Sequence, residues 1–85
     1  MSIVGKWVNY IHRMYNWYEY YEFFSDGKYT YVNTCTNQRL NGTYTLSYNV
    51  LSMTDHYRPI EIKLKDDNTL RMDLPSGKQD FTKTR

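Results

Sequence analysis

The chain has 85 residues, a formal net charge of +2 and a single cysteine, Cys35. This length suffices for one domain over residues 1–85 with a modest core, and the lone cysteine excludes an internal disulfide. No apolar run approaches the roughly 20 residues of a membrane helix. Polar residues interrupt the N-terminus before a signal peptide could form. The sequence therefore predicts a cytoplasmic protein, unless a leader has been trimmed.

Gly5–Ile11 is the first predicted strand, because alternation places Trp7 on one face and Val8 on the other. Residues 12–16 are polar enough to form a connection. A short helix is the alternative for residues 11–22, since apolar side chains there also recur at helical spacing. The aromatic enrichment of the stretch that follows favours strand.

Trp17–Phe24 and Lys28–Thr34 flank Asp26-Gly27, a strong hairpin signal. Both turn residues are expected to adopt positive φ, which glycine does freely and aspartate tolerates. Alternation predicts one set of hairpin side chains facing inward: Tyr21, Phe23, Tyr29 and Tyr31.

Four further strands and a closing one complete the chain, and short turns separate them. In the turn at Tyr48-Asn49, Asn49 is expected in the left-handed region. The predicted strands are Leu40–Tyr48, Val50–Thr54, Ile60–Lys65, Leu70–Leu74 and Lys78–Arg85.

Short connections imply sequential antiparallel neighbours, so the sequence predicts an all-β fold, an eight-stranded up-and-down meander that closes into a small barrel. A sandwich or an open coiled sheet is the structural alternative. An eight-stranded barrel is only just wide enough for its own side chains, and large ones should fill it. The predicted interior comprises Trp7, Tyr21, Phe23, Tyr29, Tyr31, Tyr44, Leu46, Leu51, Met53, Ile60, Ile62, Leu64, Leu70, Met72, Leu74 and Phe81.

Three short motifs carry a family resemblance: Gly5-Lys6-Trp7, the Phe23–Tyr29 hairpin and Asn41–Tyr44. In this order they resemble a lipocalin-like (calycin-type) domain of the short bacterial or phage variety. The resemblance implies that Trp7 plugs one end of the barrel, that Lys83 or Arg85 packs across its indole, and that an apolar ligand could lie inside. The chain departs from typical secreted lipocalins in its short length and in lacking disulfides and the T-D-Y motif.

No pattern of catalytic or metal-binding residues is present, so neither an enzyme, a metal site nor a cofactor is expected. His12 and His56 are far apart in the sequence and fit no zinc motif. Glu19 falls on the inward side near a strand end, where it is expected at the barrel rim. Glu22 faces the opposite way, so the two carboxylates cannot form a catalytic pair.

A nucleic-acid partner is not expected, because the outward basic residues Lys63, Lys65 and Arg71 lie far along the chain from the outward aromatic residues. Those rings instead predict a protein-binding or self-association surface, since a monomer rarely exposes so many together. Pairing across strands or cover by another segment would be a structural explanation. The predicted contact residues are Tyr10, Tyr15, Trp17, Tyr18, Tyr20 and Phe24.

The sequence therefore predicts a non-catalytic protein-binding module. Its small size, single cysteine and tyrosine-rich composition would also suit an inhibitor of a host factor encoded by a mobile element, such as an anti-CRISPR protein. The alternative function is a carrier or sensor of a small apolar ligand inside the barrel.

Overall fold

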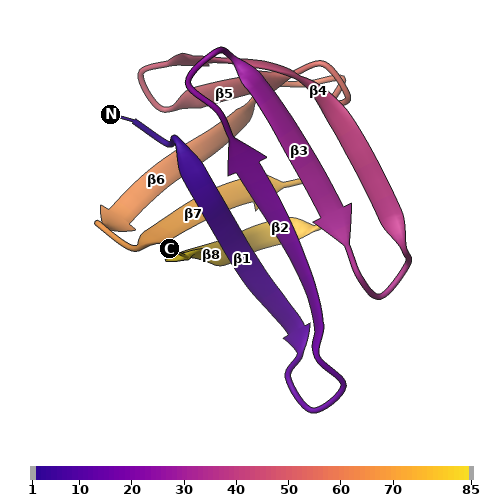
Figure 1. The fold of residues 1–85 in the computed structure, drawn as a ribbon. Helices are drawn as coiled ribbons and strands as arrows, with labels where there is room; N and C mark the ends of the chain where they lie inside the picture. The colour runs from indigo at the N-terminus through magenta and orange to yellow at the C-terminus, as the bar shows by residue number, and fades with distance from the viewer. Residues whose placement is uncertain (1, 85) are drawn as a thin grey trace.

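The computed structural model describes residues 2–84, which form eight antiparallel strands in a closed barrel, each strand paired with its neighbours in sequence (Figure 1). The predicted meander is confirmed. Between Ser2 and Thr84 there is no helix of the length and hydrophobicity that a membrane crossing requires. The strands are β1 Gly5–His12, β2 Trp17–Phe23, β3 Lys28–Asn33, β4 Gln38–Ser47, β5 Val50–Met53, β6 Ile60–Asp66, β7 Thr69–Leu74 and β8 Gly77–Thr84.

The alternative of a helix in residues 11–22 is wrong, because β1 and β2 pair residue by residue from Gly5↔Phe23 to His12↔Trp17. One irregularity interrupts this register between Tyr10 and His12. The extra residue, Ile11, has no cross-strand partner, as in a β-bulge.

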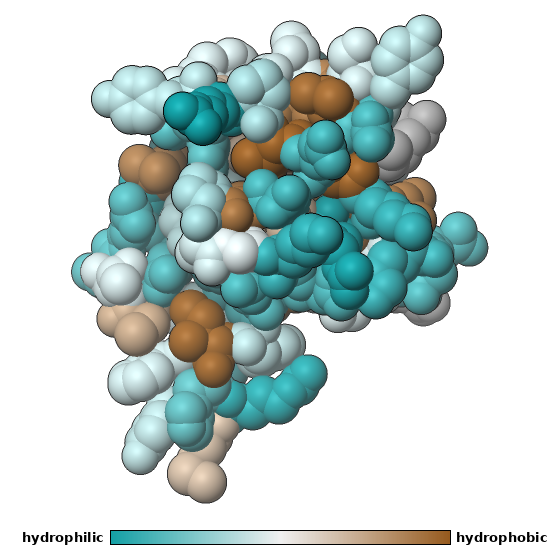
Figure 2. All heavy atoms as spheres, turned by 180° about the vertical axis from the view of Figure 1, so that it is seen from behind, coloured by the Kyte–Doolittle hydropathy of each residue, from teal (hydrophilic) through white to brown (hydrophobic). Residues whose placement is uncertain are grey.

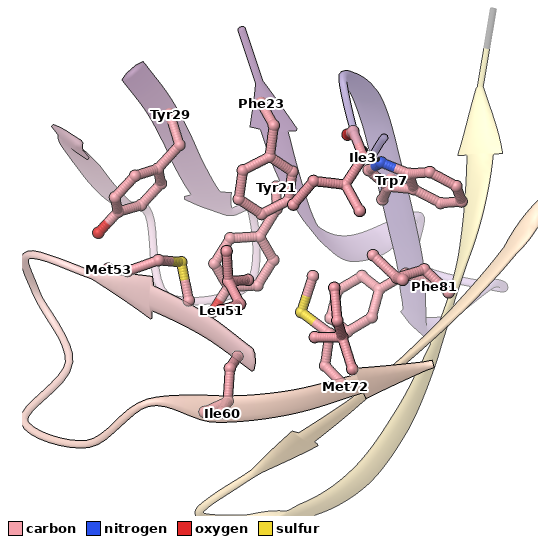
Figure 3. Close-up of a cluster of buried hydrophobic side chains, with 12 residues drawn as sticks. Ile3, Trp7, Tyr21, Phe23, Tyr29, Leu51, Met53, Ile60, Met72 and Phe81 are labelled. Carbon is pink, nitrogen blue, oxygen red and sulfur yellow. Dashed lines mark hydrogen bonds between the residues drawn. The ribbon is translucent and has the colours of Figure 1, made fainter. Parts of the chain in front are cut away.

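The core lies inside the barrel, and Figure 3 shows its buried side chains. Every predicted interior residue belongs to this core or packs against it. Eleven of them are buried, and Tyr31, Tyr44, Leu46, Leu64 and Leu74 are partly buried against these. One further residue, Ile3, joins the core from the segment before β1. The Trp7 indole Nε1–H donates a hydrogen bond of 2.9 Å to the Ile3 carbonyl oxygen, which holds this segment over the adjacent end of the barrel.

Two turns differ from their predictions. The β2–β3 connection is wider than a two-residue turn, since the Gly27 N–H donates to the Phe24 carbonyl and the Phe24 N–H to the Lys28 carbonyl. Of Asp26 and Gly27, only Gly27 has positive φ, at 87°, as in a type I turn followed by a left-handed glycine. In the β4–β5 turn, the positive φ falls on Tyr48, at 57°, and not on Asn49.

The strand pairs of the barrel differ in the number of residues that they pair. β5 has four residues and pairs with β6 through only two residue pairs, Val50↔Glu61 and Leu51↔Ile60. β1 and β8 pair only over Lys6–Val8. The β1–β2 and β3–β4 hairpins therefore extend beyond the closed part of the barrel, at the end opposite to Ile3 (Figure 1). We call this the distal end.

Candidate functional site

The end of the β1–β2 hairpin, residues 10–18, projects from the body of the molecule (Figures 1 and 2). β1 has no β8 partner beyond Val8, whereas its pairing with β2 continues to His12. Five large apolar or aromatic side chains here are exposed, with exposed fractions from 41% for Trp17 to 83% for Met14. We call residues 10–18 the aromatic hairpin.

One face of the hairpin carries a row of tyrosines. Tyr10 and Tyr18 are cross-strand partners and therefore share a face, with ring centroids 5.8 Å apart. Tyr20 continues the row, 6.4 Å from Tyr18. Cations lie over both ends, with Arg13 4.4 Å from the Tyr10 ring centroid and Lys6 4.1 Å from that of Tyr20. This face is thus both aromatic and basic.

The other face carries a second ring cluster. His12 and Trp17 are cross-strand partners with ring centroids 6.2 Å apart. Tyr15, in the connecting turn, lies 4.6 Å from the His12 ring and 5.1 Å from the Trp17 ring. By strand alternation Trp17 shares the side of Glu19 and Tyr21, which is the inward side of the barrel wall. The bulge at Ile11 brings His12 onto that same side.

The structure therefore gathers four of the six predicted contact residues at the aromatic hairpin: Tyr10, Tyr15, Trp17 and Tyr18. Tyr20 is half-buried beneath Lys6 and lies nearer the barrel. Phe24 lies in the turn at the opposite end of β2, so it does not join them. Sequence reasoning missed His12 and the two cations, because their placement depends on the bulge and on cross-strand register.

A polar network lies inside the distal end. Glu19 accepts hydrogen bonds from the Tyr31 hydroxyl, at 2.7 Å, and from Asn9 Nδ2, at 3.3 Å. Asn9 Nδ2 also donates to Gln79 Oε1, at 3.3 Å, which links β1 to β8 beyond the end of their backbone pairing. Glu19 thus lies at the rim as expected, held by polar side chains from its two neighbouring strands, β1 and β3.

At the other end of the barrel, Trp7 is 1% exposed and Lys83 Nζ lies 5.5 Å from the centroid of its ring. The two residues are cross-strand partners on β1 and β8. This contact is within cation–π range. Arg85, the other residue expected across the indole, lies outside the described residues.

Comparison with protein-family models, curated proteins and solved structures found no match.

Elsewhere, the predicted outward basic residues of β6 and β7 take part in ion pairs. Lys65 Nζ lies 3.2 Å and Arg71 Nε 2.9 Å from Asp80 carboxylate oxygens. The hydrogen bond from Arg71 lowers the pKa of the Asp80 carboxyl. Two of the three basic residues thus share a carboxylate. Within residues 2–84 no three His, Cys, Asp or Glu side chains lie in a group suited to a metal ion.

Two inward-facing tyrosines, Tyr29 and Tyr31, predict a loss of stability in alkali. Burial and then the hydrogen bond to Asp55 raise the pKa of Tyr29 from 10.0 to about 12. Burial and then the hydrogen bond to Glu19 do the same for Tyr31. The folded state therefore favours the protonated phenols, and their stabilisation is complete below about pH 10 and lost as the pH rises through about 12. We expect the thermal midpoint to fall across this window.

Circular dichroism and tyrosinate absorbance, recorded together, check this expectation. Unfolding should accompany ionisation of the last tyrosines. Ionisation of all ten tyrosines near pH 10 with the thermal midpoint unchanged would contradict it.

Proposed function

We propose that this protein is a non-catalytic protein-binding module and that the aromatic hairpin is its contact element. The observation that carries the proposal is the concentration of exposed rings on a projecting hairpin: Tyr10, Tyr15 and Trp17 are all more than 40% exposed. Aromatic side chains with few rotatable bonds lose little entropy on binding, and tyrosine and tryptophan are enriched among interface hot spots.

The shape of the hairpin favours insertion into a groove over docking on a flat surface. Its rings lie on two faces, Tyr10 and Tyr18 on one and His12 and Trp17 on the other. Its base is fixed in the barrel by the continuous pairing of β1 with β2. A rigid, pre-formed element loses less entropy than a flexible loop when it binds.

The charge of this segment favours an acidic partner over a second copy of the chain. Residues 2–18 contain Lys6 and Arg13 and no aspartate or glutamate. A two-fold contact between two hairpins would bring like charges together, whereas an acidic groove would attract them.

Alanine at Tyr15 and Trp17 together should abolish capture of a protein partner. Each such anchor contributes about 2 kcal/mol or more to binding, which is about thirtyfold in affinity for one residue. The measurement is affinity capture from the native host with the immobilised protein, followed by titration of the captured partner. Sedimentation of the protein alone measures self-association in parallel.

Tyr57→Ala is the matched control, because Tyr57 is a fully exposed aromatic residue outside the hairpin. The partner should bind this variant as it binds the unsubstituted chain. Equal capture of the partner by the hairpin variant and by the control would refute the proposal. A partner whose affinity is unchanged by every substitution in residues 10–18 would also refute it.

The barrel itself supports two narrower proposals. We propose that it is lipocalin-like, because Trp7 and Lys83 meet in the arrangement that the resemblance implies. We also propose that the binding role is inhibitory, since a small barrel with one rigid projecting hairpin suits a blocker of a host protein. A carrier of an apolar ligand in the barrel centre has less support, because side chains from all eight strands fill that space.

A further inference from the structure

A cavity of about 220 Å³ lies beside the filled core. It occurs where β4 continues past the end of β5, so that Gln38 and Leu40 of β4 face the loop after β5 and not a paired strand. Asp55 and His56 of that loop form the opposite wall. The inward tyrosines of β2 and β3 complete the lining: Tyr21, Tyr29 and Tyr31.

Among the residues that line this cavity, Tyr21 is the buried one whose polar group has no partner in the described part of the chain. Tyr29 donates to Asp55 Oδ2 at 2.6 Å and Tyr31 to Glu19 Oε2 at 2.7 Å. Tyr21 is 4% exposed, and within residues 2–84 its hydroxyl forms no hydrogen bond. In the same part of the chain, every fully enclosed polar side-chain atom has a partner. The Tyr21 oxygen must therefore reach open space, and the cavity that Tyr21 lines provides it.

Within the described part of the chain, the carboxylates at this cavity are not paired with a cation. Among residues 2–84, the carboxylates of Asp55 and Glu19 have no lysine, arginine or histidine nitrogen within 4.0 Å. Glu19 is coupled to the cavity through the Tyr31 hydroxyl. The faces of aromatic rings carry partial negative charge as well. This surrounding attracts a cation and repels an anion.

We propose that this cavity binds a small organic ammonium compound, a primary amine on a short or flat apolar body. Its N–H groups would donate to the Tyr21 hydroxyl oxygen and to the Asp55 carboxylate, and its apolar body would pack against Leu40 and the ring of Tyr31. The volume is below the roughly 300–1,000 Å³ of pockets for drug-sized ligands, which limits the ligand to a small one. This proposal does not depend on the function of the aromatic hairpin.

A series of three probes of similar shape tests the proposal on the unsubstituted protein. Benzylamine is cationic at neutral pH, benzyl alcohol is neutral and benzoate is anionic. Binding is measured by isothermal titration calorimetry and by nuclear magnetic resonance shifts of Leu40 and His56. We expect saturable binding of benzylamine with shifts at these residues, at least tenfold weaker binding of benzyl alcohol, and no binding of benzoate.

Two substitutions test the donor and acceptor roles. Tyr21→Phe removes only the hydroxyl, and Asp55→Asn removes only the charge. Each should weaken the binding of benzylamine about tenfold, since Tyr21→Phe removes a hydrogen bond to the ammonium group and Asp55→Asn removes the charge that strengthens the other. Tyr48→Phe and Asp67→Asn, both at exposed positions that do not line the cavity, are the matched controls and should leave the affinity unchanged.

The proposal is overturned if benzylamine fails to bind saturably, which would indicate a cavity that holds only water. Equal binding of benzoate or benzyl alcohol would also overturn it, as would shifts confined to Tyr15 and Trp17. An unchanged affinity of the Tyr21→Phe protein would refute the assigned geometry. The probe series uses the unsubstituted protein, so a folding defect in a variant leaves the test intact.

Discussion

Trp7→Ala should lower the free energy of unfolding by about 3–5 kcal/mol, the usual cost of truncating a buried tryptophan. Trp7 is 1% exposed, donates a hydrogen bond to the Ile3 carbonyl and lies under Lys83. The substitution therefore leaves a cavity and releases the segment that covers this end of the barrel. A chain of this length has a total stability of about 4–13 kcal/mol, so the loss is a large part of the whole. Urea denaturation followed by circular dichroism measures it.

Trp17→Ala is the matched control, because it removes the same side chain from a position that is 41% exposed. Its cost should stay below about 1 kcal/mol, since surface substitutions away from the core change stability little. Equal losses for the two variants would show that the hairpin is part of the stabilising core and would count against its proposed role as a free contact element.

Gly42→Ala should destabilise the barrel by about 2–3 kcal/mol, through overpacking. A Cβ atom at Gly42 would overlap the Thr54 hydroxyl oxygen and lie 2.9 Å from Cε1 of the Tyr29 ring. It would also come within 3.2 Å of the Asp55 carboxylate, which accepts the Tyr29 hydrogen bond. Thermal and urea denaturation report the loss.

A double variant separates the two contacts. Adding Thr54→Ala to Gly42→Ala removes the overlap with the hydroxyl but keeps the close approach to Tyr29. The double variant should therefore recover part of the stability lost on Gly42→Ala and not all of it. A Gly42→Ala protein as stable as the unsubstituted chain would show that β4 and the loop after β5 move apart without cost.

The fold was predictable because apolar side chains recur at every second residue in most of the strands. In residues 60–65, apolar Ile60, Ile62 and Leu64 alternate with charged residues, and the same two-residue period recurs in the other strands. A register slip of one residue would turn all these side chains outward, so the pattern specifies which face is buried. The short connections then leave few arrangements other than a meander.

The features that were not predictable depend on single residues whose effect is not local. The bulge at Ile11 brings His12 onto the side of Trp17, whereas unbroken alternation along β1 would place His12 on the side of Tyr10. Ile3 belongs to no periodic segment, and only its position over Trp7 reveals its role. The cavity arises because β5 has four residues while β4 has ten, a mismatch that strand prediction cannot resolve to the needed accuracy.

The two-pair joint between β5 and β6 has a mechanical consequence. Every other adjacent pair of strands is held by at least three residue pairs, so this joint is the weakest strand pairing of the barrel. When the barrel opens locally, it should open there first. The amide protons of β5 should therefore exchange with solvent sooner than those at the centre of β2. Opening at this joint would also give small molecules a way into the cavity, since Asp55 and His56 lie in the loop that connects β5 to β6.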